Sequence, residues 1–328
     1  MRTEGSRPQK PLLQKIVKRI SLALQLSVIM RLQDAGSVQC ATQTKDLDVD
    51  WLYLFQTVVL GIVEGLTEFL PISSTGHLII ASDAVGFADR PGSDTFVIAI
   101  QAGAILAVCW YYRRRIFSII RGIFSEPVEQ RLAVNTIVAF LPAAVIGVIC
   151  AGVIKSYLFN VVTVAAALII GGVIILWVER WQMKTGAEPR VLTMDDMTWK
   201  DALKVGFMQC LAMIPGTSRS GATIIGGMVL GLSRRAATEF SFFLSIPTIF
   251  GATVYDLWKS RELLTLDNLD GIVVGGVISF ASALLVVHWL LRYVSGHDFR
   301  GFGWYRIIFG IVILALVGSG VIEWRSDF

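Results

Sequence analysis

Long runs of apolar residues dominate the chain from residue 51 onward, and short polar segments separate them. Six of these runs approach the roughly 20 residues that a helix needs to cross a bilayer. The pattern therefore predicts an all-α integral membrane protein with six transmembrane helices. The predicted spans cover residues 96–112, 136–154, 161–178, 240–258, 272–291 and 305–322.

Two further apolar regions, about residues 51–88 and 199–232, are interrupted by polar groups. Each region contains one proline beside glycine and serine residues, Pro71 in the first and Pro215 in the second. Irregular backbone at membrane depth is tolerated only where it is buried in protein or lines a cavity. We therefore predict two re-entrant helical hairpins here rather than two further spans.

The two halves of the chain follow one plan. The prolines of the two breaks are 144 residues apart, and the same offset pairs Ser73 with Thr217 and Phe96 with Phe240. Each half contains one broken hairpin followed by three spans, so the second copy would enter the membrane upside down. Such an inverted-topology repeat places its site near the midplane, where the broken helices meet. Chance similarity among apolar residues is the alternative.

Composition supports a membrane protein, because 54% of the residues are apolar and only 16% are charged. We expect a single membrane domain over residues 51–324, made of two inverted repeats at about 51–180 and 199–324 that a cytoplasmic linker joins. Membrane lipid is an expected partner and nucleic acid is not. Residues 1–50 form a basic N-terminal extension of unknown role. A signal-sequence core, an amphipathic surface helix and a misplaced start site all remain open for it.

Lysine and arginine are distributed unevenly between the two sides of this topology. Fourteen lie on the side of the cluster at residues 113–115, and five lie on the other side. The positive-inside rule makes the first side cytoplasmic. The first hairpin then enters from outside and the second from the cytoplasm, so that their tips converge.

Two glutamates precede the first break. Glu64 and Glu68 are four residues apart and share one helix face, just before Pro71. A carboxylate at membrane depth is costly unless it is paired, protonated or bound to metal. The pair therefore predicts a nearby cation, which is Arg219, a divalent metal such as Mg²⁺ or Ca²⁺, or both. Two solvated glutamates at a helix end are the structural alternative.

Hydroxyl groups follow the same proline. Ser73 and Thr75 are expected to cap the helix that begins near Gly76. Ser74 differs, because His77 follows one helical turn later and its imidazole is expected to reach a hydroxyl or a bound phosphate. A serine and a histidine within reach form a candidate nucleophile and base.

The second break carries groups that suit an anion. A helix beginning near Ser220 would direct free N–H groups and its positive end toward a ligand. The guanidinium of Arg219 offers a fork of donors that matches phosphate oxygens. An interfacial arginine at the cytoplasmic edge is the structural alternative. The candidate phosphate ligands in this stretch are Gly216, Thr217, Ser218, Arg219, Ser220 and Thr223.

The motifs EGLTEFLPISSTGH and PGTSRSGAT, which start at Glu64 and Pro215, closely resemble those of the undecaprenyl-diphosphate phosphatase family linked to bacitracin resistance. The resemblance covers residues 51 to about 324. It implies a multi-pass protein of the bacterial cytoplasmic (inner) membrane with a site open to the outer face. The implied reaction removes the terminal phosphate of a C55 isoprenyl diphosphate and yields the monophosphate carrier for cell-wall assembly. It also implies a divalent cation, usually Mg²⁺ or Ca²⁺.

Roles for the motif residues follow from this resemblance. Glu64 and Glu68 would bind the metal, and the second motif together with Ser73 would bind the substrate. Attack has two versions. In one, Ser74 attacks the phosphorus and His77 takes its proton; in the other, a water molecule attacks, activated by His77 or Glu68. The candidate catalytic residues are Glu68, Ser74, His77 and Arg219.

A function from another class is also compatible with this plan. Inverted repeats with broken helices are typical of secondary transporters, so an ion-coupled carrier or a lipid-phosphate flippase is the alternative. A carrier needs no nucleophile, and the hydroxyls beside His77 therefore favour the enzyme. The sequence leaves the oligomeric state open, with a homodimer as one candidate.

Overall fold

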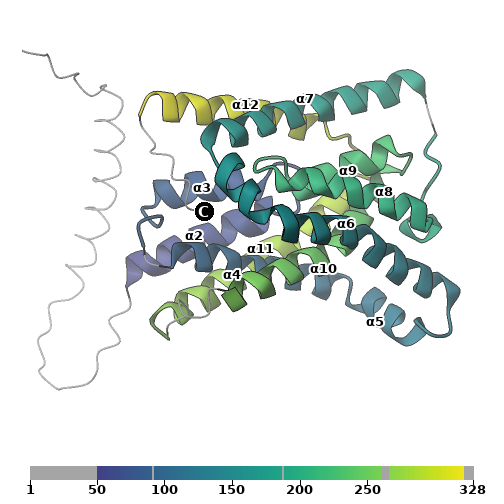
Figure 1. The fold of residues 1–328 in the computed structure, drawn as a ribbon, viewed down its shortest axis with the longest axis horizontal. Helices are drawn as coiled ribbons and strands as arrows, with labels where there is room; N and C mark the ends of the chain where they lie inside the picture. Colours follow the sequence, from purple (N-terminus) through teal and green to yellow (C-terminus); the bar gives the residue numbers. More distant parts are fainter. Residues whose placement is uncertain (1–49, 91, 187, 260–265, 321–328) are drawn as a thin grey trace, which may run out of the picture.

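The computed structural model describes residues 50–90, 92–186, 188–259 and 266–320 (Figure 1). Within these ranges the chain is helical, with one isolated bridge and no β-strand, which confirms the predicted all-α fold. Almost all of the predicted N-terminal extension lies outside the described residues. The helices are α2 (Trp51–Thr67), α3 (Ser74–Ala84), α4 (Ser93–Tyr111), α5 (Arg113–Gly122), α6 (Pro127–Leu158), α7 (Val161–Thr185), α8 (Trp199–Cys210), α9 (Arg219–Val229), α10 (Arg234–Lys259), α11 (Leu266–Tyr293) and α12 (Arg300–Gly318), with 3₁₀ turns η1 (Met194–Asp196) and η2 (Leu211–Met213).

Five of the described helices, α6, α7, α10, α11 and α12, are long and apolar enough to cross a membrane. A sixth candidate is α4 together with α5, a pair that is bent by 71°. The bend falls at Tyr112, directly before three arginines. Charged side chains are costly in hydrocarbon, so the chain turns where the arginines begin. Five to six spans agree with the expected multi-pass protein.

Apolar side chains cover the outward faces of these helices. Val148 and Ile149 of α6 are 81% and 74% exposed, and Leu285 of α11 is 71% exposed. Apolar surface on this scale is unfavourable in water and favourable against lipid chains. The surface of the helical body is therefore that of a membrane-embedded protein.

Both predicted breaks are present. A loop with Pro71 separates α2 from α3, and a loop with Pro215 separates η2 from α9. The helices that follow, α3 and α9, each have 11 residues and begin after a serine with positive φ. These serines are Ser73, with φ of 73°, and Ser218, with φ of 71°. A non-glycine residue rarely adopts this conformation, so the two breaks share an unusual local geometry.

The alignment of the two breaks differs from the predicted alignment by one residue. The positive-φ serines are 145 residues apart, so Ser73 corresponds to Ser218 and not to Thr217. In this register Gly216, whose φ is 90°, corresponds to Pro71. A Cβ atom there would lie 2.8 Å from the Cα atom of Val164 in α7. Only glycine allows the loop to pass so close to this helix.

Each broken region packs against a long helix from the other half of the chain. Helix α2 packs along α11, and α8 packs along α6. Gly61 of α2 and Gly206 of α8 allow this approach, because a Cβ atom would lie 2.6 Å from the Gly275 carbonyl oxygen and 2.5 Å from the Ala139 carbonyl oxygen, respectively. Helix α4 contacts α11, α10 contacts α6, and α4 also contacts α10. Helices α7 and α12 lie side by side along the top of Figure 1.

Candidate active site

The loops of the two breaks meet inside the protein. The Ser220 hydroxyl donates to the Leu70 carbonyl oxygen at 2.7 Å, and the Ser218 hydroxyl lies 3.4 Å from the same oxygen. These contacts join residues about 150 positions apart in the sequence. The tips of the two broken regions therefore converge, as the sequence predicted.

A buried ion pair connects the loops. Nη2 of Arg219 lies 3.1 Å from Oε1 of Glu68, and the two side chains are 11% and 10% exposed. The second oxygen of Glu68 accepts a hydrogen bond of 2.6 Å from the Ser74 hydroxyl. Arg219 also donates to the Ser241 carbonyl oxygen at 3.0 Å and lies over the ring of Phe69. Glu68 thus links the arginine of one loop to the hydroxyl at the start of α3.

Three polar atoms of this cluster are buried and have no hydrogen-bond partner among the described residues. They are both carboxylate oxygens of Glu64, which is fully buried, and Nε of Arg219. Burying such groups without partners is unfavourable, so the carboxylate calls for a cation or a proton and the N–H for an acceptor. The cluster is complementary to a cation bound beside an anion.

The carboxylates fit a divalent cation that prefers hard oxygen ligands. Glu64 supplies two uncommitted oxygens, and Glu68 is the neighbouring carboxylate one helical turn later. Among the described residues, no group of three or more His, Cys, Asp or Glu side chains is placed to hold a metal. A cation held by these two glutamates would therefore fill its remaining positions with substrate oxygens or water.

The start of α9 is arranged to receive an anion. The Ser218 hydroxyl caps this helix by accepting a 3.1 Å hydrogen bond from the Gly221 N–H. The first amides of a helix lack intrahelical acceptors, and the helix dipole is positive at that end. Arg219 occupies the first helical position, so its positive charge adds to the field of the dipole. Together these groups have the charge and the donors that suit phosphate oxygens.

The other candidates of the second motif have supporting contacts. The Thr223 hydroxyl donates to the Arg219 carbonyl oxygen at 2.9 Å and lies 2.6 Å from the Ser241 hydroxyl. The carbonyl oxygens of Gly216 and Thr217 accept hydrogen bonds of 3.0 and 2.8 Å from Arg306. Gly216 and Thr217 therefore contribute backbone that is anchored from behind.

The expected hydrogen bond between Ser74 and His77 is absent, because both ring nitrogens of His77 have other partners. Nδ1 lies 2.7 Å from the Ser73 carbonyl oxygen, and Nε2 lies 2.6 Å from the Tyr305 hydroxyl. A carbonyl oxygen only accepts, so Nδ1 carries the proton and Nε2 of the neutral ring accepts from Tyr305. The ring also stacks on Phe309, with centroids 4.1 Å apart. The structure pairs Ser74 with Glu68 instead.

The capping role predicted for Ser73 is also corrected. Ser73 occupies the N-cap position of α3, but its side chain makes no capping hydrogen bond. Its φ of 73° turns its carbonyl oxygen to Nδ1 of His77. The backbone of Ser73, rather than its hydroxyl, therefore shapes the start of α3.

Sequence reasoning missed three residues of this region, Ser241, Tyr305 and Arg306. Arg306 had a readable signal, because it lies inside the predicted span of residues 305–322 and a charge within a span is a functional candidate. Ser241 belongs to a set of hydroxyl residues at helical spacing along α10. Tyr305 carries no comparable signal, since an aromatic residue at a span end is usually an interfacial anchor.

Comparison with known proteins gives consistent matches. The sequence profile of the family described as "Bacitracin resistance protein BacA" matches residues 57–312. The chain is 55% identical to "Undecaprenyl-diphosphatase 2" of Rhodospirillum rubrum over 278 residues and 54% identical to "Undecaprenyl-diphosphatase" of Cupriavidus metallidurans over 294 residues. It is also 54% identical to "Undecaprenyl-diphosphatase" of Nitrosomonas europaea over 279 residues. Each match covers 85% of this chain and all of the relative.

Proposed function

This chain belongs to the BacA family of bacitracin resistance proteins, and on that premise we propose that it hydrolyses undecaprenyl diphosphate to undecaprenyl phosphate and inorganic phosphate. One observation carries the proposal beyond the family match. Glu68 joins the Arg219 guanidinium and the Ser74 hydroxyl, so a cation for phosphate and a nucleophile meet at one buried carboxylate. This combination is suited to the transfer of a phosphoryl group.

The second loop binds the diphosphate in this proposal. Phosphate oxygens accept from the first amides of α9 and from the side chains of Ser218 and Arg219. Nε of Arg219, which has no partner in the part of the chain that the structure describes, is one of the donors available to them. Ser220 and Thr223 hold the loop and the start of α9 in place through Leu70 and Ser241.

Ser74 is the proposed nucleophile and Glu68 its base. The Ser74 oxygen forms a bond to the terminal phosphorus, and the bond from phosphorus to the bridging oxygen breaks with its electron pair leaving on the lipid monophosphate. The hydroxyl proton moves to Oε2 of Glu68, its present hydrogen-bond acceptor at 2.6 Å. Water then cleaves the phosphoserine and regenerates Ser74. His77 shapes the start of α3 through the Ser73 carbonyl oxygen, and its two ring nitrogens are paired with Ser73 and Tyr305 rather than with Ser74.

Glu64 and Glu68 would hold the divalent cation, Mg²⁺ or Ca²⁺. When bound, such a cation supplies charge neutralisation on the phosphoryl group. Glu64 is the stronger ligand candidate, because both of its oxygens are buried and uncommitted while both oxygens of Glu68 already accept hydrogen bonds.

The proposed topology is six transmembrane helices plus two re-entrant hairpins in an inverted repeat of about residues 51–180 and 199–324. Three features support it: the matching serine geometry at the two breaks, the equal length of α3 and α9, and the reciprocal packing of α2 on α11 and α8 on α6. The glycines at these contacts, Gly61 and Gly206, are separated by the same 145 residues as the two serines. Unrelated contacts would not share this offset.

The bacterial cytoplasmic (inner) membrane is the proposed location, with the site open to its outer face. The excess of lysine and arginine on the side of α5 supports this orientation. There the product would re-enter the lipid-carrier cycle of cell-wall synthesis, and removal of the diphosphate would confer resistance to bacitracin. The transporter alternative has less support, since all three relatives described above are named as diphosphatases.

Purified protein in detergent is expected to release phosphate from C55 isoprenyl diphosphate when Mg²⁺ or Ca²⁺ is present. Chelation should abolish release, and adding metal back should restore it, because the buried oxygens of Glu64 need a cation. Glu64→Gln should raise the metal concentration for half-maximal activity by about tenfold or more, since lost support at metal sites costs about 10–100-fold in affinity. A malachite-green phosphate assay across a metal titration measures both effects.

The matched control for this titration is Glu239→Gln, which removes a carboxylate from the more exposed ion pair with Arg235. Its metal dependence should equal that of the wild type. An unchanged titration for Glu64→Gln would assign the metal elsewhere. Absence of phosphate release with both metals would refute the hydrolase function itself.

Glu68→Gln is expected to lower kcat by about 10²–10⁴-fold, the range for loss of a general base. Glutamine keeps the shape of the side chain and can accept a hydrogen bond from Arg219, but it cannot take the proton of Ser74. KM should change much less than kcat. Steady-state kinetics of phosphate release, with Glu239→Gln as the control, measures the difference. A near-normal kcat would exclude Glu68 as the base.

A further inference from the structure

Arg306 of α12 is buried behind the two loops, with 1% of its surface exposed. A guanidinium carries five N–H donors, and each of the five in Arg306 meets a backbone carbonyl oxygen. Two of these oxygens belong to α7, one to the first loop and two to the second. The acceptors are Leu168 at 3.3 Å, Ala167 at 3.0 Å, Pro71 at 3.1 Å, Gly216 at 3.0 Å and Thr217 at 2.8 Å.

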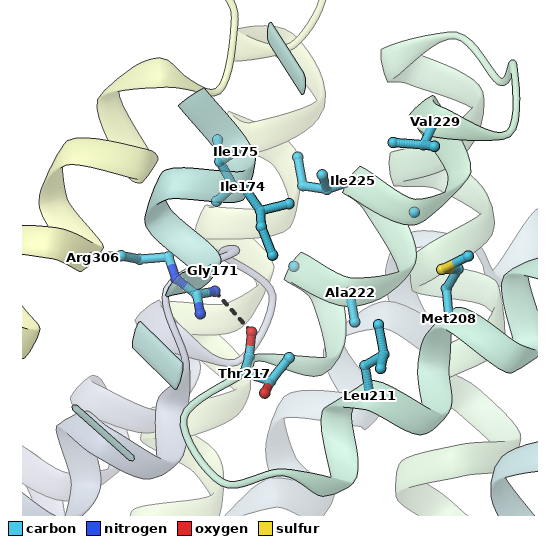
Figure 2. Close-up of a pocket in the computed structure, with 12 residues that line it drawn as sticks. Gly171, Ile174, Ile175, Met208, Leu211, Thr217, Ala222, Ile225, Val229 and Arg306 are labelled. Carbon is cyan, nitrogen blue, oxygen red and sulfur yellow. Dashed lines mark hydrogen bonds between the residues drawn. The ribbon is translucent and has the colours of Figure 1, made fainter. Parts of the chain in front are cut away.

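The space for this guanidinium is made by missing side chains. A Cβ atom on Gly171 of α7 would lie 2.7 Å from Cζ of Arg306, and one on Gly221 of α9 would lie 3.0 Å from its Nη1. Figure 2 shows the guanidinium beside Gly171, aimed at the Thr217 carbonyl oxygen at the edge of an apolar cavity of about 150 Å³. Backbone therefore surrounds the charge, and no donor is left for a ligand.

We propose that Arg306 is a positioning residue that sets the two loops in register for phosphoryl transfer, an inference whose catalytic part rests on the proposed function. Among the described residues, Arg306 is the side chain that donates hydrogen bonds to carbonyl oxygens of both loops and of α7. A peptide plane directs its C=O and its N–H to opposite sides. With the Thr217 oxygen held toward Arg306, the amide N–H of Ser218, the N-cap residue of α9, is directed away from Arg306.

The charge of Arg306 adds to this geometry. The guanidinium donates to the carbonyl groups of Pro71, Gly216 and Thr217, so its positive charge acts directly on the backbone of both loops. Low local dielectric strengthens such an effect. A neutral side chain of similar length would lose both the charge and most of the five hydrogen bonds.

Three variants separate positioning from folding. Arg306→Gln removes the charge and most of the donors, and Arg306→Lys keeps the charge on a single nitrogen. Gly171→Ala retains the arginine but adds a methyl group that displaces its guanidinium. The matched control is Gly152→Ala on α6, where an added Cβ meets no atom within 4 Å. Each is purified in detergent and its kinetics are expressed per folded molecule.

Arg306→Gln is expected to lower kcat by about 10²-fold with a much smaller change in KM, because misplacement of catalytic groups by about 1 Å costs about that factor. Gly171→Ala should lower kcat in the same sense but less, and Gly152→Ala should match the wild type. Arg306→Lys should show an added loss of kcat as pH rises, since a buried lysine deprotonates more readily than arginine. A purely structural role would lower the folded fraction and leave kcat and the pH profile of the folded molecules unchanged.

Hydrogen–deuterium exchange tests the positioning role of Arg306 without measuring the reaction. Peptides that cover residues 68–73 and 214–221 should exchange faster in Arg306→Gln and Gly171→Ala than in the wild type, while α4 and α11 keep their rates. Unchanged exchange in both loops would overturn the positioning role even if the wild type is an active phosphatase. If both variants exchange faster but the wild type shows no phosphatase activity, the positioning role of Arg306 would stand and the proposed function would be rejected.

Discussion

Replacing Arg219 by alanine is expected to lower kcat for phosphate release by about 10³-fold or more, comparable to the loss of an arginine that stabilises a phosphoryl-transfer transition state. Arg219 is the side chain that links Glu68 of the first loop to Ser241 of α10. Its removal takes away a phosphate ligand and leaves the buried Glu68 carboxylate without its cation. Both effects act at the reacting group, so the loss should appear mainly in kcat.

Arg219→Lys separates charge from geometry at this position. A lysine ammonium carries the same charge but cannot present the planar fork that reaches Glu68 and Ser241 simultaneously. We expect an activity between those of the wild type and the alanine variant, lower than the wild type by about 10²-fold. Arg235→Ala, in which an exposed arginine is lost from α10, is the matched control and should retain full activity. Wild-type kcat in Arg219→Lys would show that only the charge matters.

The helical body was largely predictable from the sequence, for a physical reason. Lipid tolerates only apolar helices with satisfied backbone, so span positions follow from hydropathy alone. The breaks were predictable because Pro71 and Pro215 remove backbone donors within apolar regions that also contain hydroxyls and charges. The bend between α4 and α5 is local too, since it falls where the arginines after Tyr112 end the apolar run.

The partners within the site were less predictable, because tertiary contacts decide them. His77 was expected to pair with Ser74 from their spacing, but Tyr305, 228 residues away, takes one ring nitrogen. The unusual φ of Ser73 brings its carbonyl oxygen to the other. A sequence pattern gives helix-face neighbours and cannot give contacts of this kind. The close approach of Gly216 to Val164 of α7 is likewise a tertiary contact that sequence spacing does not show.

Ser74→Ala is expected to lower kcat by at least about 10³-fold, because loss of a nucleophile removes the covalent route and leaves only binding and electrostatic stabilisation. The Ser74 hydroxyl makes one side-chain hydrogen bond, to Glu68, so the substitution should cost little stability. Phosphate release and thermal unfolding of the same preparations measure both quantities. Ser245→Ala, in a buried serine of α10 whose hydroxyl donates to the Phe242 carbonyl oxygen, is the matched control and should remain active.

A quenched reaction of the wild type with labelled diphosphate should yield a phosphorylated peptide that contains Ser74, and the alanine variant should yield none. This outcome separates attack by serine from attack by water, because water would leave no label on the protein. Near-normal turnover of Ser74→Ala, together with an unlabelled wild type, would assign the attack to water. Glu68 would then remain the base, with a water proton in place of the serine proton.

The double variant Ser74→Ala, Glu68→Gln tests whether the two residues act as one unit. If Glu68 works by accepting the Ser74 proton, its loss matters only while Ser74 is present. The double variant should then be little worse than Ser74→Ala alone, since residues that act together are strongly non-additive. Full additivity of the two losses would mean that Glu68 serves the reaction independently of Ser74, through Arg219 or through the cation, and would refute the proton transfer from Ser74 to Glu68.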